Sequence, residues 1–408
     1  MKITGIIVEY NPFHNGHKYH IEKTKSITNC DSIIAVISGN FVQRGAPSMV
    51  DKWNKTKMAL LNGVDLVLEL PVLYSLSSAE FFAYGAVSLL ENLGVVENLC
   101  FGSECEDIKL LTLIGKILCE EPEELRLTLK EKLYQGMSYA SARGYALKEF
   151  FCRKYPLKNN SITEILHLPN NILAIEYCKS LARLKSTINP VSIKRIGNSY
   201  NSTHINHGFS SATSIRNFLK ENNSLQELEK ALPYNILCIL RNLSHSNYKF
   251  TFEDSLVPYL KYKNLFYGKN IKYLPDVSEG LENRIEKALK NASSYDQIIN
   301  YAKTKRYTYS RISRILCQFF LGFENLDTKA LRKNKCPYGR VLGFNSKGME
   351  ILKEIKQNSS IPIYTKLPKN INDTLKLDIM ATKGYSLLNK NIAFNQDYIS
   401  SPLIMDKI

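Results

Sequence analysis

The chain has 408 residues, of which 44% are hydrophobic and 23% are charged, and its formal net charge at pH 7 is +16. This composition excludes a disordered chain, and the length fits two or three folded domains. No apolar run approaches the about 18 residues that a membrane-spanning helix needs, whereas the positive charge favours a polyanionic partner, either a nucleic acid or an acidic membrane surface.

The nine cysteines are an odd number and include no Cys-x-x-Cys pair. They fit reduced thiols in a cytoplasmic protein better than a disulfide framework or a zinc site. The apolar patch at the N-terminus is too short for a signal peptide. We therefore expect a cytoplasmic protein that does not bind a membrane.

Apolar runs and helical patterns alternate in the first quarter of the chain. The pattern predicts a strand at 3–8, a helix at 15–26, a strand at 31–38, a loop at 39–45, a helix at 51–62, a strand at 65–70, a helix at 77–94 and a strand at 98–101. Strands that alternate with helices are typical of a parallel sheet. The fold class that we predict is α/β, with a Rossmann-like, doubly wound parallel sheet.

The pattern changes near residue 225. Before it we expect helices over 106–160 and 169–181, a last strand at 191–196 and a hydroxyl-rich helix start at 209–219. After it helices dominate, and short extended pieces at 340–344 and 361–364 flank a helix at 347–356. We therefore divide the chain into a sheet domain, residues 1–225, and a mainly α-helical C-terminal domain, residues 226–408.

The turn between the first strand and the first helix carries a candidate anion site. Its sequence places His14 and His17 on either side of Gly16. Glycine lets the backbone approach a ligand, a helix start offers unpaired N–H groups, and imidazoles donate hydrogen bonds to phosphate oxygens. Two polar surface histidines are the alternative. Asn40 and Arg44 follow the second strand, so we expect them at the same edge of the sheet.

A site of this kind suits the triphosphate of a nucleotide. The chain lacks the lysine-bearing phosphate loop, Gly-x-x-x-x-Gly-Lys-Ser/Thr. With histidines instead, the reaction we expect is attack on the α-phosphorus with release of pyrophosphate. His14 and His17 would face the phosphates, and Arg216 with the hydroxyl groups of Ser211 and Thr213 would hold the pyrophosphate side.

Residues 303–340 form the most basic stretch, with ten Lys or Arg and two acidic residues. A helical apolar stripe runs through it, and we expect Arg311 and Arg314 to lie off that stripe. A solvated helix face is the alternative. We interpret the run as a phosphate-tracking surface made of Arg306, Arg311, Arg314, Arg332, Lys333, Lys335 and Arg340.

Two motifs resemble those of the nucleotidylyltransferase superfamily. The first is His14–His17, which is similar to the signature His-x-Gly-His, and the second is Ser211–Arg216, which resembles Ser-Ser-Thr-x-Ile-Arg. Ala212 replaces a serine of the second motif, which removes one possible phosphate contact. Their order on one α/β domain makes the pair more specific than either motif alone.

A closer resemblance covers nearly the whole chain and points to the bacterial tRNA(Met) cytidine acetate ligase family. The segments that carry it are Gly5–His17, Ser38–Gly45, Phe101–Glu104, Pro169–Leu173, Lys194–Ile196 and Arg340–Phe344. The chain departs from the family pattern at Ala46, where an acid is expected, and at Gly339, which replaces a bulkier residue. Neither position belongs to the expected nucleotide pocket, although Gly339 bears on a tRNA contact.

The resemblance implies a two-step reaction with ATP, acetate and elongator tRNA(Met). Acetate and ATP give acetyl-adenylate, and the acetyl group then passes to N4 of the wobble cytidine, C34, to form N4-acetylcytidine. Residues 1–225 would be the catalytic domain and residues 226–408 the tRNA-binding domain. Mg²⁺ is expected with ATP, but no carboxylate pair stands out as its ligand.

The resemblance also implies which residues contact the nucleotide. His14, His17 and Arg216 would be catalytic. The ATP-binding residues would be Ile7, Val8, Glu9, Tyr10, Asn11, Pro12, Phe13, His14, Asn15, Gly16, His17, Lys18, Tyr19, His20, Gly102, Asn170 or its neighbour Asn171, Arg195 and Ile196.

Simpler interpretations remain for several of these residues. Asn170 and Asn171 could simply be capping residues of a helix, without a contact to the nucleotide, and Arg195 could be a surface charge. Lys52 could be a phosphate partner or solvent-exposed. His204 and His207 have metal spacing without a third ligand, and we set them aside.

Two other functional classes stay open at this stage. One is a nucleotidylyltransferase that acts on a mononucleotide or on phosphopantetheine, against which the basic stretch counts. The other is a non-catalytic RNA-binding protein, against which the intact histidine pair and Arg216 count. No feature of the sequence indicates a stable protein partner.

Overall fold

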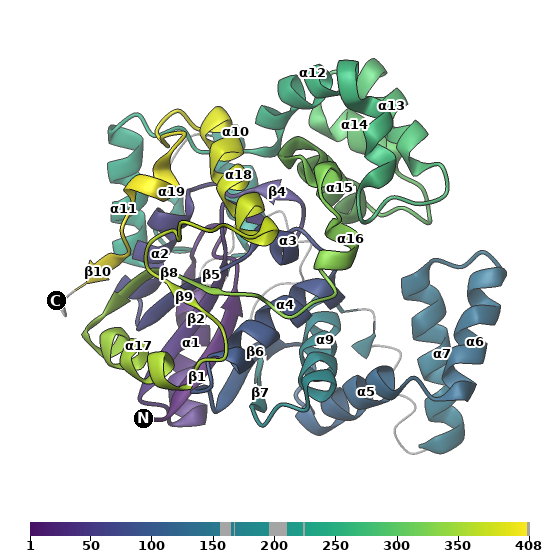
Figure 1. Cartoon of the computed structure of the whole chain (residues 1–408), viewed down its shortest axis with the longest axis horizontal. Coiled ribbons are helices and arrows are strands. Elements are labelled where there is room, and N and C mark those ends of the chain that lie inside the picture. Colours follow the sequence, from purple (N-terminus) through teal and green to yellow (C-terminus); the bar gives the residue numbers. More distant parts are fainter. Residues whose placement is uncertain (156–164, 167, 196–209, 223–224, 406–408) are drawn as a thin grey trace.

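A mostly parallel sheet forms the centre of the protein (Figure 1). The computed structural model describes residues 1–155, 165–166, 168–195, 210–222 and 225–405. The strand order is β10-β8-β5-β2-β1-β6-β7, and β9 pairs with β8. The strands are β1 (Ile3–Val8), β2 (Ser32–Ser38), β5 (Leu66–Leu70), β6 (Asn98–Ser103), β7 (Asn189–Lys194), β8 (Gly339–Asn345), β9 (Ile363–Tyr364) and β10 (Leu403–Met405).

The central strands are buried along their whole length, which is why they read as continuous apolar runs. Every residue of β1, β2 and β5 is buried. Helices cover the faces of such a sheet, so both sides of each strand need apolar side chains. The predicted Rossmann-like sheet is confirmed, and so is the helical character of the C-terminal region.

The helices that accompany the sheet agree closely with the predicted ones. They are α1 (Asn15–Thr28), α2 (Lys52–Leu61), α3 (Val72–Ser75), α4 (Ala79–Asn92), α5 (Ile108–Glu120), α6 (Glu123–Tyr134), α7 (Tyr139–Lys154), α9 (Pro169–Leu184) and α10 (Ala212–Asn222). A short hairpin of β3 (Phe41–Val42) and β4 (Ala46–Pro47) follows β2. Figure 1 shows α6 and α7 projecting away from the sheet.

A second group of helices follows α10. It comprises η2 (Gln226–Leu228), α11 (Tyr234–His245), η3 (Glu253–Leu256), α12 (Val257–Tyr267), η4 (Gly268–Tyr273), α13 (Leu281–Asn291), α14 (Tyr295–Ala302), α15 (Tyr309–Leu321), η5 (Phe323–Asn325) and α16 (Thr328–Leu331). The helices α17 (Ser346–Asn358), α18 (Asp373–Leu388) and α19 (Gln396–Ile399) complete the chain. None of the described helices is long and apolar enough to cross a membrane.

The C-terminal part of the chain returns to the first sheet. Strand β8 lies antiparallel to β5, and β10 lies parallel to β8. The extended pieces predicted at 340–344 and 361–364 correspond to β8 and β9. The predicted division near residue 225 did not anticipate that they join the first sheet, because a short extended pattern does not reveal which sheet edge it joins. The sheet is therefore built from both ends of the chain.

The helical region and the sheet share one hydrophobic core, to which Ile6 of β1, Leu68 of β5 and Phe319 of α15 all belong. The contact is closest at Gly45, where φ is +84° and an added Cβ would lie 2.2 Å from the backbone nitrogen of Arg314. No side chain fits between them, so glycine is required. The loop that carries Arg44 is therefore fixed against α15.

Candidate active site

The histidine pair forms a capping box at the start of α1. Nδ1 of His14 accepts a hydrogen bond from the Gly16 N–H at 3.0 Å, and Nδ1 of His17 accepts one from the His14 N–H at 3.3 Å. The two rings stack with their centroids 3.8 Å apart. A nitrogen that accepts a hydrogen bond carries no proton, so each neutral ring bears its proton on Nε2. Both Nε2–H groups are therefore hydrogen-bond donors.

Both rings of the pair are uncharged at neutral pH. Burial lowers the pKa of His14 to about 3, and the charges of Arg195 and Arg216 act in the same direction. Burial also lowers the pKa of His17 well below its ordinary value, and His14 and Arg195 contribute. The pKa of His20 falls to about 4 for the same reasons, burial first and then Arg195. The pair can thus donate hydrogen bonds without bringing charge of its own.

These pKa shifts predict that the protein loses stability below about pH 6.5. An unfolded histidine binds a proton below that pH, whereas folded His14 stays neutral to about pH 3. The unfolded chain therefore gains protons first, and His14 alone lowers the free energy of unfolding by about 2 kcal/mol between pH 6.5 and 4.5. Urea denaturation over this pH range measures the slope.

The variant His14→Asn tests the origin of that slope, since asparagine can still cap α1. It should reduce the loss of stability on acidification, whereas the control His245→Gln, at an exposed histidine of α11, should not. Equal slopes in both variants would show that His14 is not the titrating group.

The second motif lies directly against the turn that carries the histidine pair. Arg216 of α10 donates from Nη1 to the carbonyl oxygen of Asn11 at 2.7 Å. Its Nη2 lies 3.4 Å from Oγ1 of Thr213, to which Nη1 of Arg44 also donates at 3.4 Å. Ser211 Oγ accepts the backbone N–H of Ser214 at 3.1 Å, which shapes the first turn of α10. The structure thus brings the two motifs and the loop after β2 together.

The three arginines of this region repel one another. Burial lowers the pKa of Arg44 to about 10, Glu9 opposes that shift, and Arg216 and Arg195 add to it. The Glu9 carboxylate accepts the Gln43 N–H at 2.6 Å. Burial also lowers the pKa of Arg195 and of Arg216, although Glu104 acts against the shift at the first and Glu253 at the second. A polyanionic ligand would therefore stabilise the charged guanidinium groups.

Arg195 directly follows β7, at the same edge of the sheet as the histidine pair. Its backbone N–H donates to the carbonyl oxygen of Ser103 at 3.0 Å, and its Nη1 lies 3.2 Å from Oδ1 of Asn170. An added Cβ on Gly102 would lie 3.2 Å from Cγ of Arg195, so a larger residue would crowd that side chain. Gly102, Asn170 and Arg195 therefore form one contact group.

Asn171 has a different structural role from Asn170. It is fully buried, and its Oδ1 accepts hydrogen bonds from Ser103 Oγ at 2.8 Å and from the N–H groups of Glu104 and Cys105 at 2.9 Å. It therefore shapes the loop after β6. Neither asparagine caps α9, because its N-cap is Leu168 and makes no side-chain capping bond. The interpretation as caps alone is wrong.

The remaining residues of the first motif contribute in several ways. Tyr10 is fully buried, and its ring lies 4.7 Å from that of Phe13 and 4.8 Å from that of His17, centroid to centroid. Asn11 Oδ1 accepts the N–H of Met49 at 2.8 Å, which ties the turn to the segment after β4. Lys18 is exposed. The predicted contact Ile196 lies outside the described residues, as do His204 and His207.

Lys55 is part of this region although the sequence analysis did not single it out. Its side chain is fully buried, and Nζ donates to the carbonyl oxygens of Ser38 at 2.6 Å, Gly39 at 2.7 Å and Glu9 at 3.1 Å. Burial lowers its pKa to about 7, and Glu9 and Glu69 oppose the shift. Lys55 joins the carboxyl ends of β1 and β2. The only signal in the sequence was a lysine within the apolar pattern of α2.

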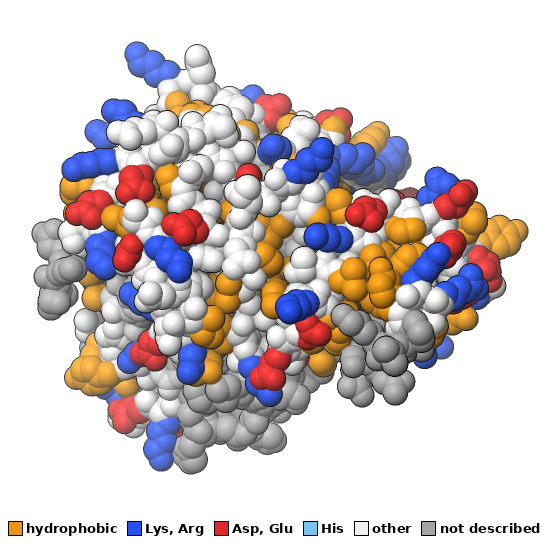
Figure 2. Space-filling view, turned by 90° about the horizontal axis from the view of Figure 1, so that it is seen from below, with side chains coloured by type: hydrophobic (Ala, Val, Ile, Leu, Met, Phe, Trp, Pro, Cys, Tyr) orange, Lys and Arg blue, Asp and Glu red, His pale blue; other side chains and the backbone are white. Residues whose placement is uncertain are grey.

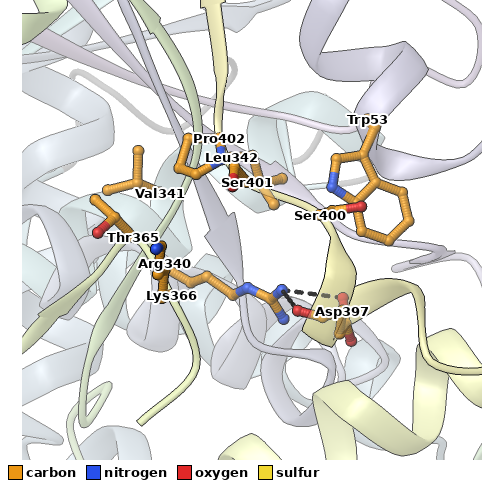
Figure 3. Close-up of a pocket in the computed structure, with 10 residues that line it drawn as sticks. All are labelled: Trp53, Arg340, Val341, Leu342, Thr365, Lys366, Asp397, Ser400, Ser401 and Pro402. Atoms are coloured by element: carbon orange, nitrogen blue, oxygen red, sulfur yellow. Dashed lines mark hydrogen bonds and ion pairs between the residues drawn. The ribbon is translucent and has the colours of Figure 1, made fainter.

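Two residues of the predicted phosphate surface are buried instead of exposed. Arg314 is 8% exposed and pairs with Asp276, so the expectation that it lies off the buried stripe of α15 is wrong. Arg340 of β8 is 6% exposed and pairs with Asp397 at 3.0 Å, and their side chains point toward each other in Figure 3. Each charge has an internal partner, which keeps it away from a surface contact.

Other members of the predicted surface are engaged as well. Asp276 accepts the Arg332 guanidinium at 2.7 Å and, through its carbonyl oxygen, Nε of Arg311 at 2.9 Å. Although burial acts to raise it, Arg314 and Arg332 hold the pKa of Asp276 below its usual value. The exposed members are Arg306, which pairs with Glu279, and Lys333 and Lys335. Figure 2 shows Lys and Arg interspersed with Asp and Glu on the face seen from below.

Lys52 belongs to a buried ion-pair network, which neither interpretation of the sequence foresaw. It is fully buried, and its Nζ lies 2.8 Å from carboxylate oxygens of both Glu69 and Asp397. Arg340 completes the network, with Nη1 3.7 Å from Glu69. The cavity in Figure 3 borders it and is lined by Trp53, Arg340, Val341, Leu342, Thr365, Lys366, Asp397, Ser400, Ser401 and Pro402.

Comparison with known proteins places these motifs in a family. Residues 1–398 match the family model HIGH Nucleotidyl Transferase. Over 408 residues, with 100% of both chains covered, the protein is 91% identical to the tRNA(Met) cytidine acetate ligase of Clostridium kluyveri (strain ATCC 8527 / DSM 555 / NBRC 12016 / NCIMB 10680 / K1). The chain belongs to the tRNA(Met) cytidine acetate ligase family.

More distant members of the tRNA(Met) cytidine acetate ligase family agree. The enzyme of Clostridium botulinum (strain Okra / Type B1) is 52% identical over 405 residues, with 99% of each chain covered. The crystal structure of Thermotoga maritima TmcAL bound with alpha-thio ATP superposes with a TM-score of 0.91 at 33% identity and covers 100% of both chains. The resemblance seen in the sequence motifs is thereby confirmed.

Proposed function

We propose that the protein is an ATP-dependent ligase that acetylates N4 of the wobble cytidine, C34, of elongator tRNA(Met). The observation that carries the proposal is the neutral histidine pair, with both Nδ1 atoms accepting backbone N–H groups and both Nε2–H groups left as donors beside Arg44, Arg195 and Arg216. Such an arrangement supports binding of a triphosphate. The family membership supports the identity of the two other substrates.

In the first step, an acetate oxygen attacks the α-phosphorus of ATP. The bond from that phosphorus to the oxygen bridging to the β-phosphate breaks, and pyrophosphate leaves with the electron pair. Negative charge grows on the leaving oxygens, toward which Nε2–H groups and guanidinium groups would donate. We assign His14 and His17 to the α- and β-phosphates, and Arg216 with Ser211 and Thr213 to the pyrophosphate side.

In the second step, N4 of the cytidine attacks the carbonyl carbon of acetyl-adenylate. The bond from that carbon to the phosphate oxygen breaks, AMP leaves, and the nitrogen loses a proton. A mixed anhydride is reactive enough for a weakly nucleophilic amine. The base must be turned out of the anticodon loop to reach the anhydride. The protein surface would hold the base in this position.

We assign the other contacts to the same pocket. Gly102, Asn170 and Arg195 would hold the nucleotide from the β6 and β7 side, since they form one contact group there. Asn171 would act through the loop that it shapes. Glu9 to Phe13 would form the floor of the pocket.

Mg²⁺ is an expected companion of ATP in this reaction. Among the described residues, no group of three or more His, Cys, Asp or Glu side chains is placed to hold a metal ion. Mg²⁺ usually keeps several water ligands and takes others from substrate phosphates, so the ATP phosphates would supply part of its coordination. RNA binding and a cytoplasmic location are likewise part of the proposal.

Acetate-dependent exchange of labelled pyrophosphate into ATP tests the first step. We expect exchange that requires both acetate and the protein and that proceeds without tRNA. Exchange without acetate would instead indicate a nucleotidylyltransferase for another small molecule. RNA binding without any exchange would indicate a non-catalytic protein, and either result would overturn the proposal.

A further inference from the structure

Exposed aromatic side chains gather on α12. This helix lies at the top of Figure 1. Tyr262, Phe266 and Tyr267 are 67%, 66% and 54% exposed, and Leu265 is 76% exposed. The ring centroids of Tyr262 and Phe266 are 5.4 Å apart, and those of Phe266 and Tyr267 are 6.3 Å apart. Large apolar side chains are normally buried, so consecutive exposed ones indicate a binding surface.

The same segment carries a group of lysines. Residues 255–275 contain four lysines and no acidic residue. Lys263 is turned inward, where it pairs with Glu324 and donates to the carbonyl oxygen of Phe319. Within the described part of the chain, no ion pair is formed by the other three, which are Lys261, Lys269 and Lys272. These three lysines lie in the same segment as the exposed rings.

We define the aromatic-basic surface as Tyr262, Phe266, Tyr267, Lys269, Lys272 and Tyr273. The first three lie on α12 and the others on η4, which packs against α12. Nζ of Lys272 lies 4.9 Å from the centre of the Tyr273 ring. Aromatic residues and lysines therefore occur together along this part of the chain.

Helix α12, which carries half of this surface, packs tightly against the part of the protein that contains the candidate active site. Val257 and Leu260 of α12 are buried, and the Tyr259 hydroxyl donates to the carbonyl oxygen of Leu387 at 2.8 Å. Helix α12 packs against α15, which in turn closely approaches Gly45. A ligand held on the surface would thus keep a fixed relation to the loop that carries Arg44.

We propose that the aromatic-basic surface binds unpaired nucleotides of the RNA substrate. The proposal rests on the proposed function, since it takes RNA as the substrate. Every base has a face that can stack on an aromatic ring, and lysines neutralise the phosphates between bases. A protein partner would need acidic groups to match these lysines, whereas RNA supplies a charge at every nucleotide. Charge complementarity therefore favours RNA.

The double variant Tyr262→Ala/Phe266→Ala tests the aromatic half of the surface. Binding of a fluorescent single-stranded heptanucleotide with the anticodon-loop sequence should weaken at least about 10-fold, because two stacking platforms are lost. Acetate-dependent pyrophosphate exchange should be unchanged. The control is Tyr234→Ala at the start of α11, where the tyrosine is 78% exposed but outside the surface.

The double variant Lys269→Ala/Lys272→Ala tests the charged half. The slope of log affinity against log salt concentration should become shallower by about 1.4, or about 0.7 for each phosphate contact to a single strand. Both lysines are exposed, so the fold should tolerate the changes. An unchanged slope would contradict the assignment of these lysines to phosphates.

Failure of this inference can be distinguished from failure of the proposed function. If the unaltered protein acetylates tRNA, but both double variants bind the heptanucleotide with the same affinity as the unaltered protein, the surface inference is overturned. If a double variant changes only the sedimentation behaviour, from oligomer to monomer, the surface is a contact between proteins and the inference is again overturned. If the unaltered protein shows no acetate-dependent exchange, the proposed function fails first.

Discussion

Replacing His17 with alanine is expected to lower acetate-dependent pyrophosphate exchange by about 10²- to 10³-fold, which is the usual cost of losing one preorganised hydrogen-bond donor. The ring of His17 carries its proton on Nε2 because Nδ1 accepts the His14 N–H at 3.3 Å. Alanine removes the donor that we assign to the phosphates. Binding of tRNA should change little, because we assign His17 to the phosphates of ATP and not to a contact with tRNA.

Two further variants make this result specific. His17→Gln keeps an N–H donor on a side chain of similar length and should recover part of the exchange rate. His245→Ala removes an exposed histidine of α11 and should leave the rate unchanged. Loss of exchange and of tRNA binding together in His17→Ala, with a lowered melting temperature, would assign His17 a structural role instead.

Replacing Asp397 with alanine is expected to lower the free energy of unfolding by about 3–5 kcal/mol. The carboxylate is 3% exposed and lies 2.8 Å from Nζ of Lys52 and 3.0 Å from Nη2 of Arg340. Without it, Glu69 is the carboxylate left in direct ion pairs with the two buried cations, and Asp378 acts on them only at longer range, so part of their charge is uncompensated. Urea denaturation at neutral pH measures the change.

An exposed ion pair provides the matched control for Asp397→Ala. Asp373→Ala removes the partner of Lys376 at 2.8 Å on the surface of α18, and it should cost less than about 1 kcal/mol. In addition, Lys52→Met combined with Asp397→Ala should cost less than the sum of the two single changes, since one buried cation is then gone. A cost below about 1 kcal/mol for Asp397→Ala would contradict the account of the network.

The periodic patterns in the sequence predicted most of the regular structure. Buried strands read as unbroken apolar runs, so β1, β2 and β5 were located to within one or two residues. The rule that parallel strands end at one edge also placed Arg44 near the histidine pair, and the structure brings Arg44 to Thr213 of the second motif. Local patterns and strand direction were sufficient for these features.

The sequence did not predict which charged side chains are buried. A lysine or arginine is expected at the surface unless its partner is known, and the partners of Lys52 and Arg340 lie at Glu69 and Asp397, far apart in the chain. The predicted phosphate surface therefore included Arg314 and Arg340. For the same reason, the sequence did not reveal that Lys55 is buried and joins the ends of β1 and β2.

The sequence also could not separate two neighbouring asparagines. Asn170 contacts Arg195, whereas Asn171 points into the loop after β6, and only the direction of each side chain decides this. The composition likewise did not predict that the aromatic rings of α12 are exposed, since most aromatic residues of a folded chain are buried.

Mass spectrometry of tRNA nucleosides is the most direct test of the central claim. Elongator tRNA(Met) would be incubated with the protein, ATP and isotopically labelled acetate, digested to nucleosides and compared with a reaction that lacks ATP. We predict N4-acetylcytidine that carries the label and forms only when ATP is present, together with AMP. Unlabelled cytidine in every reaction, while the same protein exchanges pyrophosphate into ATP, would contradict the claim that the activated acetyl group is passed to tRNA.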